Sequence, residues 1–219
     1  MPKGRLICET CRKQLIDVVE PFCMKCGKQL CDEQREYCYD CRRKQFSYDR
    51  GFAVFVYEER LQNAIADFKF RNRKEYGRFF AAEMSRYYQK YLQELKIEAL
   101  VPVPIHKSKK AYRGYNQSEV LCDELSKLAG IPVNKELMIR TNKTIPQKIL
   151  SPAERLKNLS DAIQPVKKHR ASEDDIPEHV LLVDDIYTTG STAEACSRVL
   201  KGIGVKEVYL LNIGIGLEE

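Results

Sequence analysis

Short apolar runs alternate along this chain with longer stretches in which apolar residues recur every three or four positions. The continuous apolar run at 51–57 predicts a buried strand, and the spacing of Leu61, Ile65 and Phe68 predicts a helix directly after it. The same alternation continues to the end of the sequence. It predicts strands at 99–104, 135–140, 180–183 and 207–213, and helices at about 74–95, 116–128 and 193–201, the second of them capped by Gly130.

Strands that alternate with helices form a parallel sheet with helices on both faces. We therefore predict an α/β fold. Ligands bind such sheets beyond the carboxyl ends of the strands, so the residues that follow each predicted strand are candidates for function.

The strand at 180–183 ends in two adjacent carboxylates, Asp184 and Asp185, and a short loop then leads into a helix. Free backbone N–H groups at a helix N-terminus favour a phosphate, and a glycine in the loop allows close backbone approach. The carboxylates can accept hydrogen bonds from sugar hydroxyls. The sequence therefore predicts a site for ribose 5-phosphate, with these loop residues as phosphate ligands: Thr188, Thr189, Gly190, Ser191 and Thr192.

This segment resembles the 5-phosphoribosyl-1-pyrophosphate (PRPP) signature of type I phosphoribosyltransferases, which bind PRPP with Mg2+. Two further regions fit that resemblance. Residues 103–118 correspond to the pyrophosphate loop and include Lys107, Lys109, Lys110 and Arg113. Residues 140–158, which include Arg155, correspond to the mobile loop that closes over PRPP.

Charge is distributed unevenly along the chain. The net charge is +6, but residues 102–170 have 14 Lys and Arg against 6 Asp and Glu, whereas residues 171–219 have 3 against 10. The basic central block indicates an anionic partner, namely a polyphosphate ligand, nucleic acid, or both.

Composition indicates a soluble globular protein, with 43% hydrophobic and 31% charged residues. No apolar run approaches the ~18–20 residues that span a bilayer. The first residues also lack the apolar stretch of a signal peptide. We therefore expect a cytoplasmic protein without membrane insertion.

Seven of the nine cysteines lie in the first 41 residues, and six of them form three Cys-x-x-Cys pairs: Cys8/Cys11, Cys23/Cys26 and Cys38/Cys41. Two such pairs complete a four-thiolate zinc site, and in a cytosolic chain this pattern favours metal over disulfides. Because all four thiolates would be bound, we expect a structural zinc. An iron–sulfur cluster is the less favoured occupant.

The pairing of the cysteines is open, because three pairs do not divide into complete sites. The first choice is one zinc held by the second and third pairs, and the alternative joins the first and second pairs. Cys31 is left over in the first choice.

The motif Arg113-Gly-Tyr-Asn-Gln117, the Thr/Gln/Arg/Asn spacing within 140–158 and the cysteine pairs together resemble the ComF family over almost the whole chain. The resemblance implies a zinc-binding module at 1–45 and a phosphoribosyltransferase-like domain at 46–219. It also implies a role in natural competence, in which single-stranded DNA is taken up and passed towards recombination. Single-stranded DNA and other competence proteins are the expected partners.

Two functions remain open at this point. In the first, the chain is an enzyme that transfers phosphoribose from PRPP to an acceptor that the sequence does not indicate. Asp184 and Asp185 would orient the ribose hydroxyls, and Lys107 and Arg113 would stabilise the departing pyrophosphate. In the second, the chain only senses PRPP or binds nucleic acid through its zinc region and basic loops.

Overall fold

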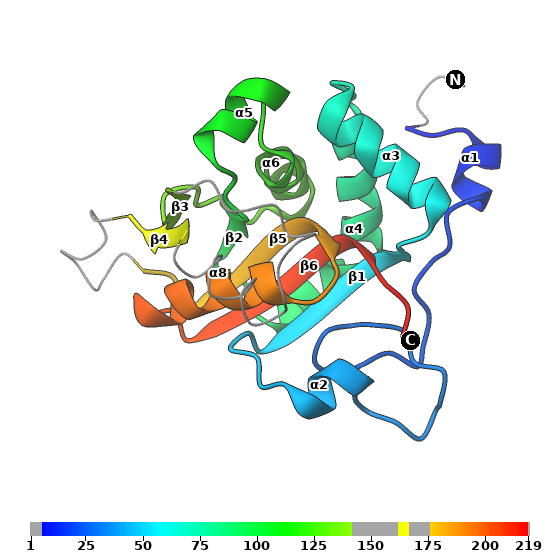
Figure 1. The fold of residues 1–219 in the computed structure, drawn as a ribbon, viewed down its shortest axis with the longest axis horizontal. Coiled ribbons are helices and arrows are strands. Elements are labelled where there is room, and N and C mark those ends of the chain that lie inside the picture. Colours follow the sequence, from blue (N-terminus) through cyan, green and yellow to red (C-terminus); the bar gives the residue numbers. More distant parts are fainter. Residues whose placement is uncertain (1–5, 142–161, 167–175, 219) are drawn as a thin grey trace.

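Four parallel strands form the central sheet of the computed structural model, which describes residues 6–141, 162–166 and 176–218 (Figure 1). The strand order is β1-β6-β5-β2. The predicted parallel sheet is confirmed, and its strands have these bounds: β1 (Arg50–Val56), β2 (Ala99–Pro102), β5 (His179–Tyr187) and β6 (Glu207–Ile215).

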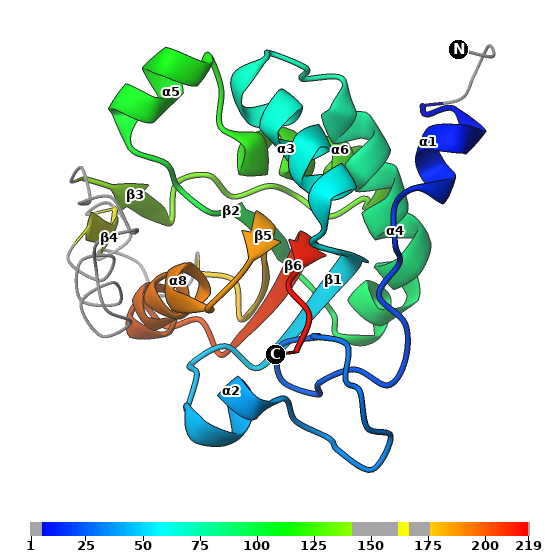
Figure 2. The ribbon, with the colours of Figure 1, turned by 45° about the vertical axis from the view of Figure 1, so that its right-hand side comes forward.

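Helices cover both faces of this sheet, as predicted (Figure 2). One face packs against α3 (Glu59–Phe70), α4 (Tyr76–Glu94) and α6 (Gln117–Ala129), and the other packs against α8 (Ser191–Gly202). The sheet is therefore buried on both sides. This explains why its strands are continuous apolar runs rather than alternating ones.

The residues of β5 show how the two cores share one strand. Leu181 and Val183 point into the core under α4 and α6, whereas Val180 and Leu182 point into the core under α8. Successive side chains of a strand point to opposite faces, so each core receives every second residue. Both cores thus fix the position of the carboxylates that follow.

Strand β5 is longer than the expected 180–183. It continues to Tyr187 because Ile186 and Tyr187 still pair with Gly214 and Ile215 of β6. Asp184 and Asp185 therefore lie within the strand and are held by its hydrogen-bonded ladder.

Residues 107–113 form a helix, α5 (Lys107–Arg113), where the sequence predicts a polar loop. None of its residues is buried, so the helix has no apolar face that a hydrophobic pattern would detect. Its ends follow local rules instead. The ring of His106 accepts a hydrogen bond from the Ser108 N–H, and Gly114 ends the helix with a φ of 82°.

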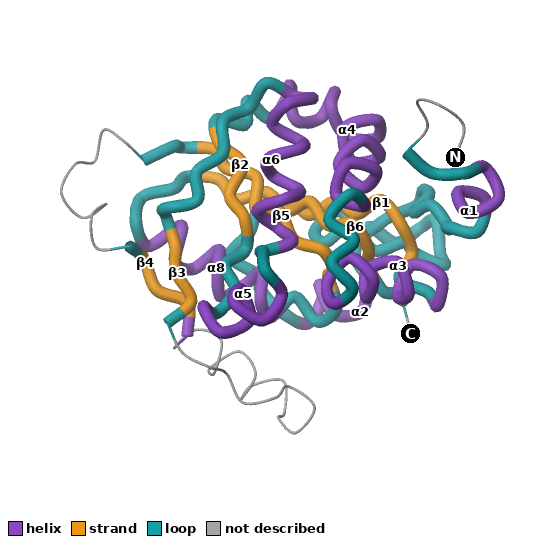
Figure 3. The backbone as a smooth tube through the Cα atoms, turned by 90° about the horizontal axis from the view of Figure 1, so that it is seen from above, coloured by secondary structure: helices purple, strands orange, loops and turns teal. Residues whose placement is uncertain are grey.

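The strand expected at 135–140 exists as β3 (Met138–Arg140), but it lies outside the central sheet. It pairs antiparallel with β4 (Ile163–Pro165). This small ribbon lies beside α8, at the end of the molecule opposite the helix Glu9–Lys13, labelled α1 (Figures 1 and 3).

The cysteine-rich segment contains two short helices, α1 (Glu9–Lys13) and α2 (Tyr39–Arg43). Cys23, Cys26 and Cys38 belong to the same hydrophobic core as α8 and the strand residues on that face. The domain boundary at 45/46 stays a prediction. No helix in the described part of the chain is both long and apolar enough to cross a bilayer.

Candidate functional site

The loop at 188–192, which we call the threonine loop, lies at the carboxyl end of β5 and leads into α8. Gly190 is the N-cap of α8 with a φ of 75°, a left-handed conformation that glycine adopts without a steric penalty. The Thr189 and Ser191 hydroxyls are 3.0 Å apart. The predicted phosphate ligands thus surround a helix N-terminus, where the backbone N–H groups favour an anion.

Asp184 lies next to this loop and lines the same pocket. Its Oδ1 atom accepts hydrogen bonds from the Ser118 hydroxyl at 3.1 Å and from the backbone N–H of Asp185 at 2.9 Å. Burial, together with repulsion from the Asp185 carboxylate, raises the pKa of Asp184 to about 7. A cation or a hydroxyl donor that reaches this pocket would favour its ionised form.

Asp185 points to the opposite side of β5 and forms an ion pair with Lys69. The Lys69 ammonium lies 2.8 Å from Oδ2 of Asp185, and both side chains are largely buried. Lys69 belongs to the last turn of α3. The helix that follows β1 therefore brings a cation to the carboxylate pair of β5.

Arg113 of α5 and Arg140 of β3 lie close enough to the carboxylates for the negative charges to act on their pKa values. Partial burial lowers the pKa of Lys109, on α5, and the positive charges of Arg140, Arg113 and Lys69 lower it further. We call Lys69, Lys109, Arg113 and Arg140 the basic cluster. The positive charges of this cluster repel one another, and three of its members lie close to the carboxylate pair. These are properties of a site that binds an anion beside carboxylates able to orient a cation or a sugar.

The structure separates the predicted site residues. Arg113 lies close enough to Asp184 and Asp185 for their charges to act on its pKa, and its guanidinium stacks over the Phe70 ring at 4.8 Å. Lys110 instead pairs with Glu119 at 2.8 Å. Lys107 is exposed at the start of α5.

Arg155, with the rest of the expected mobile loop at 142–158, lies outside the described residues. Ser118 and Arg140 lie at the ends of the predicted pyrophosphate and mobile loops but are not among the predicted ligands, and Lys69 lies outside both loops. Lys69 stands in the Phe-Lys-Phe-Arg run after a predicted helix, and only the folded chain brings it to Asp185.

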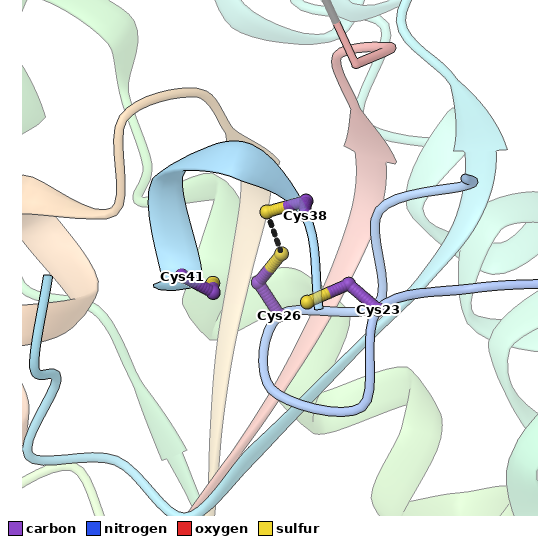
Figure 4. Close-up of side chains that lie close together, drawn as sticks. All are labelled: Cys23, Cys26, Cys38 and Cys41. Carbon is purple, nitrogen blue, oxygen red and sulfur yellow. Dashed lines mark hydrogen bonds between the residues drawn. The ribbon is translucent and has the colours of Figure 1, made fainter. Parts of the chain in front are cut away.

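The second cluster of functional side chains comprises Cys23, Cys26, Cys38 and Cys41, which we call the cysteine cluster (Figure 4). Their sulfur atoms all lie within 4.8 Å of one another, and those of Cys26 and Cys38 are 3.7 Å apart. A tetrahedral zinc with Zn–S bonds of about 2.3 Å places its sulfurs about 3.8 Å apart. The cluster therefore has the dimensions of a structural zinc site, in the first-choice pairing.

Hydrogen bonding among these thiols lowers the pKa of Cys23 and raises the pKa of Cys26. One thiolate in the cluster thus makes the next ionisation harder. Four thiolates need a cation between them, and zinc supplies two positive charges there.

The remaining pair, Cys8 and Cys11, lies at the start of α1 and lines a separate pocket against α3 and α4. The backbone N–H of Cys11 donates to the Cys8 sulfur at 3.4 Å, which lowers the pKa of Cys8, and Arg60 donates to the Cys11 sulfur at 3.6 Å. Figures 1 and 2 both show α1 well apart from α2. The alternative pairing of the first and second cysteine pairs is not the one in this structure.

Comparison with known proteins gives one family match, three relatives in sequence and one similar solved structure. Residues 1–42 match the double zinc ribbon domain family. Over 208 residues the chain is 32% identical to competence protein F of Haemophilus influenzae, covering 93% of this chain and 88% of that protein. It is 30% identical to the competence protein ComFC of Bacillus subtilis over 68% of this chain and 56% of that protein.

The chain is also 32% identical to the DNA utilization protein YhgH of Escherichia coli over 52% of this chain and 47% of that protein. Among solved structures, a purine phosphoribosyltransferase of Pyrococcus horikoshii overlaps 63% of this chain and 82% of its own, with a TM-score of 0.38 and 15% identity.

The parallel sheet with helices on both faces, and the carboxylate pair and threonine loop at its carboxyl edge, define an α/β protein whose first residues match a double zinc ribbon. Within that class the chain belongs to the ComF family, to which it is related along almost its whole length.

Proposed function

We propose that this protein binds PRPP with Mg2+ at the carboxyl end of β5 and acts in the uptake or use of DNA. The observation that supports the first part is the convergence of the threonine loop, the carboxylate pair and the basic cluster on one edge of the sheet. The names of the relatives support the second part.

Each group in the proposal has a distinct task. The threonine loop would hold the 5-phosphate through hydroxyls and the N-terminus of α8. Asp184 and Asp185 would accept hydrogen bonds from the ribose hydroxyls. Arg113, with Lys107 and Lys109 of the same helix, would balance the charge of the diphosphate. Arg155 would bind PRPP in the same site, as its place in the predicted mobile loop implies.

The residues present fit Mg2+ as well as PRPP. Magnesium prefers oxygen ligands and commonly binds through one or two carboxylates together with substrate phosphates. Lys69 already lies 2.8 Å from Oδ2 of Asp185, so Mg2+ would share the carboxylate pair with this ammonium. When bound, Mg2+ would neutralise the diphosphate and help to orient it.

Transfer of phosphoribose is the enzymatic form of this proposal. The bond between the anomeric carbon and the pyrophosphate oxygen would break, and the bond to a nucleophilic acceptor would form. This chain would contribute position and charge stabilisation. Release of pyrophosphate in the presence of a nucleobase, an amine or a nucleic acid would identify the acceptor, whereas binding without release would indicate a PRPP sensor.

Calorimetric titration of PRPP with Mg2+ tests the binding site. We expect saturable binding to the zinc-loaded wild type and its loss in Asp184→Asn/Asp185→Asn. Asp123→Asn is the matched control, because this exposed carboxylate on α6 pairs with Lys135 away from the site. Absence of binding to the wild type would refute the proposal.

Binding of single-stranded DNA is a separate arm of the proposal, supported by the basic central block. Contacts to phosphates make log K fall steeply as log salt rises. We expect the affinity for a single-stranded oligonucleotide to fall markedly between about 50 and 200 mM salt. An affinity that does not change with salt would argue against it.

A further inference from the structure

Residues 46–48, which we call the tether, connect α2 to β1 and lie between the cysteine cluster and the threonine loop. They follow Cys41 by only a few residues, and Phe46 and Tyr48 pack in the same core as the cluster. Each of the three residues contacts a different part of the segment that joins β5 to α8. Together these contacts connect the two candidate sites.

Tyr48 contacts the last residue of β5. Its hydroxyl and that of Tyr187 form a hydrogen bond of 2.7 Å, and the two rings meet edge to face with centroids 6.3 Å apart. Tyr48 is completely buried and Tyr187 almost so. A buried hydroxyl without a partner costs free energy, so each tyrosine depends on the other for its position.

Phe46 and Tyr187 together enclose Gly190 of the threonine loop. A Cβ atom added at Gly190 would lie 2.9 Å from Cζ of Tyr187 and 3.0 Å from Cε1 of Phe46, and closer still to the Tyr187 hydroxyl. The two rings therefore pack directly on the backbone of the loop. Phe46 also stacks on Tyr48, with ring centroids 5.1 Å apart.

Ser47 makes the third contact, with the first turn of α8. Its backbone N–H and its hydroxyl both donate to the carboxylate of Glu194, at 2.6 and 2.9 Å. Glu194 is buried, and its backbone N–H donates to the carbonyl of Gly190 at 2.8 Å. The tether thus reaches both the loop and the helix whose N-terminus the loop forms.

The other side of the tether is fixed by the cysteine cluster. Lys25, between the two cysteines of one pair, places its ammonium 5.2 Å from the centre of the Tyr48 ring. The carbonyl of Lys25 also accepts the N–H of Gly51 at 2.7 Å. The backbones around Gly27 and Gly51 approach so closely that a side chain at either position would collide with the backbone of the other segment.

We propose that Phe46, Tyr48 and Tyr187 are positioning residues, through which the metal-bound cysteine cluster holds the threonine loop in its phosphate-binding shape. The proposal rests on the PRPP site proposed above. Preorganised N–H groups bind an anion more tightly than groups that must first be ordered. Loss of zinc would free the tether, and the loop would then lose affinity for PRPP while the sheet stays folded.

The variant Tyr48→Phe/Tyr187→Phe tests this, because it removes both hydroxyls and keeps both rings. We expect the affinity for PRPP with Mg2+ to fall about fivefold to tenfold, with zinc content unchanged. Tyr88→Phe is the matched control. The Tyr88 ring packs on the core on the other face of the sheet, and its hydroxyl donates to the carbonyl of Ala53, so the loss of that hydroxyl should leave PRPP affinity unchanged.

Zinc removal by a chelator supplies the second arm. We expect it to weaken PRPP binding by the wild type more than binding by the double variant, in which the coupling is already reduced. Circular dichroism would verify that the sheet persists. Equal affinities of wild type and double variant, at equal zinc content, would overturn the proposal.

Amide hydrogen exchange in the threonine loop separates this inference from the PRPP proposal. We expect faster exchange at 188–192 in the double variant than in the wild type, without any ligand. If the wild type binds no PRPP, the proposed function fails. The exchange result still tests whether Tyr48 and Tyr187 hold the threonine loop in place. Unchanged exchange at 188–192 would overturn it.

Discussion

The cysteine cluster and the carboxylate pair both gather groups that repel one another when ionised, yet they balance that charge in different ways. The Lys69 ammonium lies 2.8 Å from Asp185. The lysines nearest in sequence to the cysteine cluster are engaged elsewhere, since Lys25 lies over the Tyr48 ring and Lys28 pairs with Asp40 at 3.5 Å. The charge of the carboxylate pair is balanced by a lysine of the protein, whereas the cysteine cluster requires an external cation.

This difference indicates what each site contributes. A four-thiolate site gains its charge balance only when metal binds, so metal binding there is coupled to folding. A carboxylate pair with its own lysine can stay folded without ligand and still exchange partners when a ligand arrives. We therefore expect the cysteine cluster to determine stability and the carboxylate pair to respond to ligands and pH.

The largest effect is expected from Cys26→Ser, which removes one ligand from the buried cysteine cluster. We expect zinc to fall well below one equivalent and the free energy of unfolding to drop by about 4 kcal/mol or more, because the metal stabilises only the folded state. Metal analysis and chemical denaturation would measure both quantities.

Cys31→Ser is the control for that variant, because Cys31 is exposed and lies outside the cluster. Its zinc content and stability should match those of the wild type. Full stability of Cys26→Ser after loss of zinc would contradict the view that this site is structural.

The next effect is expected from Lys69→Met, which leaves the largely buried carboxylate of Asp185 without its cation. We expect the free energy of unfolding at pH 7 to fall by about 2 kcal/mol, because breaking a buried pair leaves an uncompensated charge. Lys135→Met removes an exposed ion pair with Asp123, and should cost less than about 0.5 kcal/mol. Equal losses in the two variants would show that Lys69 does not balance the carboxylate pair.

An effect of similar size that depends on pH is expected from Asp184→Asn. The raised pKa of about 7 means that Asp184 stays protonated in the folded chain between about pH 4 and 7, whereas it ionises in the unfolded chain. The folded state binds more protons there, so the wild type loses stability as pH rises through this interval. Asp184→Asn should therefore gain stability over the wild type at pH 8, on the order of 2 kcal/mol, and little at pH 4.

Melting curves of wild type and Asp184→Asn at pH 4, 6 and 8 would measure this difference. Asp123→Asn, at an exposed carboxylate, should differ from the wild type by a small and nearly constant amount. A gain that does not grow with pH would contradict the raised pKa.

The sequence alone was sufficient to predict a candidate site where its residues follow one another along the chain. The strand, the two carboxylates and the threonine loop follow one another in 14 positions, and local rules for strands and helix N-termini predict their arrangement. The Cys-x-x-Cys pairs likewise predicted a zinc site and its preferred pairing. In each case the spacing along the chain largely fixes the distance in space.

The sequence was insufficient where partners come from distant elements. Lys69 meets Asp185 only because α3 ends beside β5, and Tyr48 meets Tyr187 across 139 positions. Helix α5 was missed for a different reason, since it buries no residue and so leaves no hydrophobic period. Local pattern thus predicted the position of the threonine loop but not the residues that contact it.

The smallest effect is expected from Cys8→Ser/Cys11→Ser, which tests whether the third pair behaves like the cysteine cluster. Both thiols are partly exposed, and the Arg60 guanidinium donates a hydrogen bond to the Cys11 sulfur. The double variant should keep the zinc bound by the cluster and change the melting temperature by less than about 2 °C. The double zinc ribbon match covers residues 1–42, which include this pair, so loss of a further equivalent of zinc would show that Cys8 and Cys11 also bind metal. The contrast between an assembled cluster and an isolated pair would then no longer hold.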